Sequence, residues 1–156
     1  MPMHPKAQKI ASAVLYEWKM FIATIAALNG VHFLGGAIRN ALLESLLIHA
    51  RILTDFFFTD PSREDDVSAK HFFHNEEDWR VDFKTECPYL YENRQRLNKS
   101  VAHLSYSRIE YESDKEWQYG RISNELHSIW DKFRSSLPTE SREWFPSGKE
   151  SLGTVV

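Results

Sequence analysis

Apolar residues recur every three or four positions along most of this chain, which is the period of an α-helix that buries one side. The first stripe predicts a helix over about 7–28, and the second a helix over about 37–58. Asn29-Gly30 lies between them, a pair typical of a helix end. The apolar positions are Ile10, Val14, Trp18, Phe21, Ile25 and Leu28 in the first stripe, then Ile38, Leu42, Leu46, His49, Leu53 and Phe56 in the second.

Two more stripes follow in the second half of the chain. Pro88 is suited to begin a helix that reaches about Tyr111, because a first-turn proline needs no amide donor. The residues 113–116 match a capping box, so a fourth helix is expected to begin there and to end at Pro138. No strand alternation competes with this pattern. The sequence therefore predicts an all-α, up-down four-helix bundle. Its later stripes contain Leu90, Leu97, Val101 and Leu104, then Ile122, Leu126, Ile129, Phe133 and Leu137.

The segment 60–86 separates the second and third predicted helices and is polar and acidic. Asp60-Pro61 resembles a helix N-cap followed by a first-turn proline, which predicts a short helix towards Phe73. The segment is longer than most connections inside a domain. We therefore expect an extra short helix or an irregular excursion, packed over one end or side of the bundle.

Length and composition limit the classes of protein. The chain has 156 residues, 42% hydrophobic and 26% charged, which suits one globular domain over 1–146. The tail 147–156 has no periodicity and is expected to be disordered. A net charge of −3 argues against coating nucleic acid by bulk charge, although a local basic site remains compatible with it.

Cysteine and hydropathy patterns bear on location. Cys87 is the only cysteine, so it cannot form an intrachain disulfide and nothing indicates an oxidising compartment. The most apolar stretch, Phe21 to Leu28, is too short to span a bilayer. We therefore expect a cytoplasmic protein that does not insert into a membrane.

The third predicted helix carries the candidate chemistry. Arg96 and His103 are seven residues apart, so both lie on one helix face about 10 Å apart along its axis. That face points away from the apolar stripe and is expected to be exposed. Arginine can hold a phosphate with two hydrogen bonds, and histidine exchanges protons near neutral pH. The pair is a candidate phosphodiester site, with Asn98, Lys99 and Ser100 as candidate substrate-binding residues.

An arginine and a histidine separated by six residues, on a late helix of a small bundle, resemble the motif of the HEPN superfamily. Membership would imply a homodimer in which Arg96 and His103 of two copies form one composite site. It would also imply binding or cleavage of RNA or nucleotides, as a metal-independent endoribonuclease without cofactors. Such a protein could belong to a defence or toxin–antitoxin module, with a nucleotidyltransferase-like partner protein.

Two other interpretations stay open. The chain could be a non-catalytic helical bundle that binds another protein, with Arg96 and His103 as ordinary surface residues. It could also be a metal-dependent bundle enzyme with His49 as a ligand, although no His-x-x-x-His or Glu-x-x-His pair supports this. The one-turn pair His71 and His74 lies in the acidic segment and is a weak metal candidate. We therefore predict no metal site and no cofactor.

Overall fold

The computed structural model describes residues 3–30, 36–100 and 116–146, and all regular structure in these ranges is helical. The all-α prediction is therefore confirmed for this part of the chain. The long helices are α1 (Ala7–Gly30), α2 (Gly36–Phe58) and α7 (Tyr119–Ser136). The short ones are the 3₁₀ helices η1 (Ala69–Phe72) and η2 (Glu76–Asp78), followed by α3 (Phe83–Glu86), α4 (Pro88–Glu92), α5 (Arg94–Ser100) and α8 (Thr139–Arg142).

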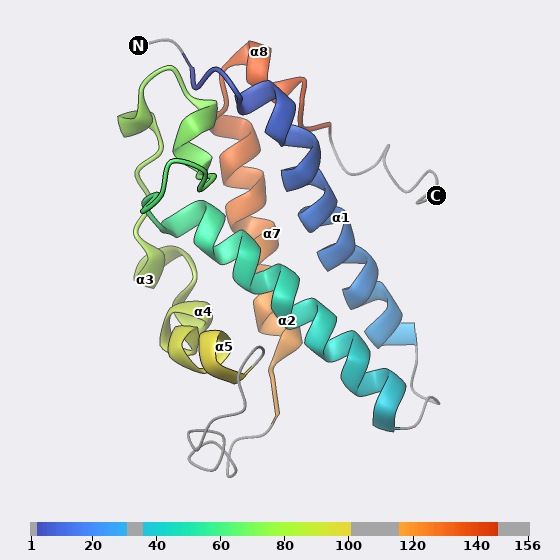
Figure 1. The fold of residues 1–156 in the computed structure, drawn as a ribbon. Helices are drawn as coiled ribbons and strands as arrows, with labels where there is room; N and C mark the ends of the chain where they lie inside the picture. Colours follow the sequence, from blue (N-terminus) through green and yellow to red (C-terminus); the bar gives the residue numbers. More distant parts are fainter. Residues whose placement is uncertain (1–2, 31–35, 101–115, 147–156) are drawn as a thin grey trace.

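The first two helices form an antiparallel hairpin that covers α7 (Figure 1). Their predicted bounds agree with the structure, and their apolar stripes face the core. Ile38 is the exception, because its side chain is 51% exposed. The buried residues of α2 begin only at Leu46, so the first turns of this helix lie beyond the core.

Aromatic rings fill the space between α2 and α7. Phe133 of α7 is fully buried, and its ring lies 5.4 Å from Phe56 and 5.7 Å from Phe57 of α2, measured between ring centroids. On the side facing α1, the indole of Trp130 stacks on that of Trp18 at 4.5 Å. Such ring pairs add stabilisation beyond the burial of their area.

The segment 60–86 holds the short helices η1, η2 and α3 and packs against the bundle, where it also contributes to the core. No helix begins at Asp60, and the first helical turn of this segment is η1, capped by the Ser68 side chain. Phe72, Phe73 and Trp79 are all buried. The indole N–H of Trp79 also donates a 2.9 Å hydrogen bond to the carbonyl of Phe57 in α2.

The third and fourth predicted helices differ from the structure at their starts. The third is interrupted at Asn93, between α4 and α5, where the Asn93 side-chain amide donates to the carbonyl of Tyr89. A side chain that bonds to the backbone in this way competes with the helical ladder. The residues 116–118 are not helical, so α7 begins at Tyr119 and not at the capping box. Its predicted end at Pro138 is confirmed.

One helix in the described part of the chain is long and apolar enough, by length and composition, to cross a membrane. It is α1, whose most apolar 18-residue window has a mean hydropathy of 1.3 with only 22% of it buried. The apolar stretch of α1 is thus longer than Phe21 to Leu28, the stretch that by itself is too short to span a bilayer. Core helices pass the same test, and α1 buries Val14, Trp18 and Phe21 against the rest of the fold.

The hydrogen bond from Trp79 gives a test of how the segment 60–86 is integrated. Trp79→Phe should lower the free energy of unfolding by about 1–3 kcal/mol, because the Phe57 carbonyl would lose its buried partner. Urea denaturation measures this. Trp144→Phe is the matched control, since Trp144 is only half-buried and its indole donates no hydrogen bond within the described residues. An equally small decrease in the free energy of unfolding in both variants would contradict a stabilising role for the hydrogen bond from Trp79 to Phe57.

Candidate functional site

Arg96 lies on α5 and is the one charged side chain that is buried among the described residues, with 7% of its surface exposed. Its guanidinium carbon lies 4.0 Å from the centre of the Trp117 ring. A cation at this distance is attracted by the negative face of the indole. The expectation that Arg96 lies on an exposed helix face is therefore wrong: the Trp117 ring covers it.

The other predicted site residues are placed only in part. Asn98 is half-buried and Lys99 is exposed on α5, and Ser100 is the last residue of this helix. His103 lies outside the described residues, so the distance between Arg96 and His103 stays a prediction. The structure therefore positions the arginine of the motif but not its histidine.

The backbone near Arg96 is held by a carboxylate that sequence reasoning missed. Glu125 of α7 accepts hydrogen bonds from the backbone N–H groups of Tyr89 and Leu90, at 2.8 and 3.0 Å. These donors have no intrahelical partner at the start of α4, so the carboxylate satisfies them. The phenol of Tyr89 in turn accepts from the Gln118 N–H at 3.1 Å. These bonds attach α4 to the start of α7, next to Trp117.

Three further cations lie on α5 and the first turn of α7. Arg121 lies over the Tyr89 ring at 4.8 Å, and Lys99 is exposed one turn after Arg96. Arg94 donates a 3.0 Å hydrogen bond to the Thr59 hydroxyl and has a carboxylate oxygen of Asp55 at 3.9 Å. These cations share the region with carboxylates, which include Glu125 and the exposed Glu116.

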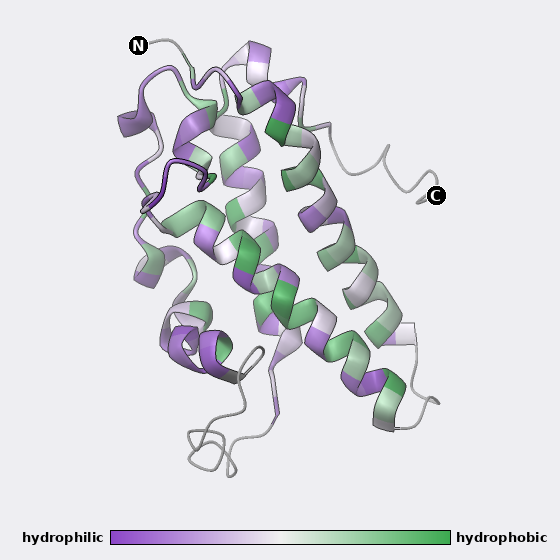
Figure 2. Cartoon of the chain, viewed as in Figure 1, coloured by the Kyte–Doolittle hydropathy of each residue, from purple (hydrophilic) through white to green (hydrophobic). Residues whose placement is uncertain are grey.

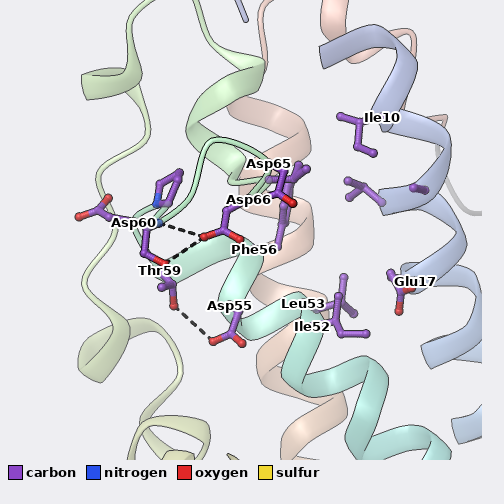
Figure 3. Close-up of a pocket in the computed structure, with 15 residues that line it drawn as sticks. Ile10, Glu17, Ile52, Leu53, Asp55, Phe56, Thr59, Asp60, Asp65 and Asp66 are labelled. Atoms are coloured by element: carbon purple, nitrogen blue, oxygen red, sulfur yellow. Dashed lines mark hydrogen bonds between the residues drawn. The ribbon is translucent and has the colours of Figure 1, made fainter. Parts of the chain in front are cut away.

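A second candidate is a cavity of about 550 Å³ between α1, the end of α2 and the segment after it (Figure 3). Its walls are apolar, with Val14 and Leu53 among the lining residues, and its rim carries carboxylates. Asp66 accepts hydrogen bonds from the Ser62 and Arg63 backbone N–H groups, and these bonds lower the pKa of the Asp66 carboxyl. The Asp66 carboxylate thus stabilises the turn formed by residues 62–66 at the rim of the cavity.

His49 contacts the carboxylate of Glu17, a residue that lines this cavity. Its Nδ1 lies 2.6 Å from Oε2 of Glu17, and both side chains are mostly buried, with 12% and 22% exposed. This partner explains how a polar imidazole is accommodated in the apolar stripe of α2. His49 is therefore a hydrogen-bonded residue at the edge of the core.

Metal-ligating side chains do not converge within the described ranges, where no group of three or more His, Cys, Asp or Glu could hold an ion. His71 receives the Ser68 N–H at 3.5 Å, and burial lowers its pKa. His74 pairs with Glu140 at 2.7 Å. The Nδ1–H of His127 donates a 2.7 Å hydrogen bond to the carbonyl of Ser123 in its own helix. Each of these histidines therefore has a local role.

The chain matches no protein-family model, and no curated protein or solved structure is similar to it. Its function must therefore be argued from the side chains themselves.

Cys87 next to Glu125 is not a usable nucleophile. It is fully buried, and burial, together with the Glu125 and Glu86 carboxylates, raises the pKa of its thiol from 9.0 to about 12. At pH 8 the thiolate population should be about a thousandfold below that of an ordinary cysteine. We expect the native protein to react with a thiol reagent at least that much more slowly than the protein in guanidinium chloride. Equal rates in the two states would contradict this burial.

Proposed function

We propose that this protein is a HEPN-like helical bundle that binds RNA or nucleotide phosphates and cleaves RNA without a metal. Arg96 serves as the phosphate-binding cation and His103 as the acid–base group. The part of the predicted third helix after Ser100 lies outside the described residues, and the up-down four-helix arrangement is part of this proposal. The protein works as a homodimer, in which two motifs form one site.

The burial of Arg96 is the observation that carries the proposal. Removing a guanidinium from water is unfavourable unless other groups compensate for it, so chains rarely retain a buried arginine on the surface helix of a small domain. Here it is retained at the motif position and held against Trp117 at 4.0 Å. A guanidinium that is already oriented loses little conformational entropy when it binds a phosphate.

The local charge supports the same chemistry. The protein carries a net charge of −3, yet Arg94 and Lys99 lie on the same helix as the motif arginine, and Arg121 lies in the first turn of α7. A concentration of positive charge on an acidic protein attracts phosphates at one place and avoids general adhesion to nucleic acid. Asn98 and Lys99 are the side chains of α5 that we assign to the entrance of the site.

The chemistry requires more than one motif. Attack by an RNA 2′-hydroxyl needs a base, the departing 5′-oxygen needs an acid, and the phosphorane needs a cation. One imidazole cannot act as base and acid in the same step. Two copies related by a two-fold axis supply two imidazoles and two guanidiniums. His103 of one copy then removes the proton, and His103 of the second copy protonates the leaving oxygen.

Cleavage of labelled single-stranded RNA in the presence of EDTA tests this function. The wild-type protein should cleave it, and His103→Ala should reduce the rate at least about a hundredfold, the usual contribution of a general acid or base. Arg96→Lys should also lower the rate, since an ammonium cannot bind phosphate bidentately. Arg80→Gln is the control for a lost positive charge, because Arg80 is exposed in the segment 60–86.

Circular dichroism on each variant separates lost chemistry from lost folding. Retained cleavage in a folded His103→Ala protein would contradict the assignment of the acid–base group. A wild-type protein that neither binds nor cleaves RNA would contradict the function as a whole.

A further inference from the structure

Uncharged residues at helical spacing make up one outward side of the α1–α2 hairpin, and charged residues flank it. In Figure 2 both helices are coloured as hydrophobic over much of their length. Ten positions make up this face, seven of them exposed and three half-buried. We call it the outer apolar face. Its residues are Ala13, Tyr16, Met20, Ala23 and Ala27 of α1, with Ile38, Ala41, Ser45, Ile48 and Ile52 of α2.

The spacing of these residues is that of a helix–helix seam. In both helices the steps alternate between three and four, the pattern by which one helix packs lengthwise against another. Neither seam is used within the described residues. Tyr16 is 54% exposed, and Ile48 and Ile52 are 44% and 42% exposed.

The two seams form one continuous surface. The Tyr16 ring of α1 meets His49 of α2 edge-on at 6.3 Å, and Ala13 and Ile52 line the same cavity between the helices. This outward surface explains why only 22% of the most apolar window of α1 is buried. This helix has one apolar side in the core and a second apolar side outside it.

We propose that a second copy of this chain packs on the outer apolar face, so that two α1–α2 hairpins form an antiparallel four-helix bundle. The face runs over 15 residues of each helix, a length of about 22 Å, and two neighbouring helices are about 20 Å wide. The face itself would thus cover about 440 Å² per copy, and the side chains that flank it would add to this towards the roughly 800 Å² per partner of a stable complex. This surface excludes Arg96, so the inference does not rest on the proposed function.

Side-chain size favours α1 of one copy lying on α2 of the other. The seam of α1 is mostly alanine, whereas that of α2 carries three isoleucines. Counting from the Glu17–His49 contact along the antiparallel hairpin, Ala13 is level with Ile52, and Ala27 is close to the level of Ile38. A two-fold axis parallel to the helices therefore sets small residues against large ones.

The charges beside the face are compatible with this arrangement. Lys19 lies along the free edge of α1, and Glu44 and Arg51 lie along the free edge of α2. Counting from the Glu17–His49 contact, Lys19 of one copy lies nearer to the level of Glu44 of the other than to that of Arg51, so the closer pair has opposite sign. A lipid bilayer is the less favoured occupant, because Glu17, Glu44 and Arg51 lie within or directly beside the surface that would enter it.

Analytical ultracentrifugation of the full chain tests the interface. The double variant Ile48→Glu with Ile52→Glu should sediment at half the mass of the wild-type assembly of 18.3 kDa chains, with an unchanged circular dichroism spectrum. Half the mass is a monomer if the outer apolar face is the sole contact, and a dimer if the Arg96 motifs also pair. Tyr91→Glu is the matched control, since Tyr91 of α4 is equally exposed at 45% but lies outside the face. It should keep the wild-type mass.

A cross-linking experiment tests the arrangement. A mixture of Ala13→Cys chains with Ile52→Cys chains should form disulfide-linked dimers on mild oxidation. Each variant alone should form few, and the native Cys87 is buried and inert. Self-linking of Ala13→Cys would place α1 on α1 and overturn the arrangement.

Three results would overturn the proposed interface. These are a wild-type monomer at 100 μM protein, a folded double variant that keeps the wild-type mass, and a wild-type chain that is monomeric in buffer but floats with vesicles of phosphatidylcholine and phosphatidylglycerol. The last result would assign the outer apolar face to a membrane.

Discussion

The ring of Phe133 is the contact on which the rest of this fold depends. Seven other aromatic rings lie within 6.1 Å of it between centroids, from α2, the segment 60–86, α7 itself and the C-terminal Phe145. Large rigid rings bury much area with little loss of side-chain entropy. Because these rings pack around Phe133, segments that are far apart in the sequence lie against α7.

This core also determines which surfaces remain for function. The segment 60–86 and the residues after α7 pack on α7 together with one side of the α1–α2 hairpin. The second apolar side of this hairpin therefore faces outwards. At the other end, the Glu125 carboxylate attaches α4 to α7. The start of α7 then presents Trp117 to Arg96. The outer apolar face and the buried arginine are thus two separate consequences of one core.

Much of the fold could be predicted from periodicity, and the failures have physical causes. The bounds of α1 and α2 and the end of α7 follow from apolar stripes and breakers. The role of Trp79 could not be predicted, because an aromatic residue among acids gives no period and its bond to Phe57 is made across 22 positions. Ile38 was assigned to the core because the three- and four-residue pattern of α2 contains two overlapping stripes, one for each side of the helix. For the site, the motif indicates Arg96. The contact between Arg96 and the Trp117 ring could not be predicted, because Trp117 is not helical and lies outside any periodic stretch.

The claim most central to this account is that Arg96 is a preorganised cation for phosphate. The side-chain Nε–H signals of arginine in a ¹H–¹⁵N spectrum test it directly, because the indole face at 4.0 Å displaces the Arg96 signal by its ring current. The account predicts one displaced, exchange-protected arginine signal that is absent in Trp117→Ala and moves when a short single-stranded RNA is added. An RNA that shifts other resonances and leaves this signal in place would contradict it.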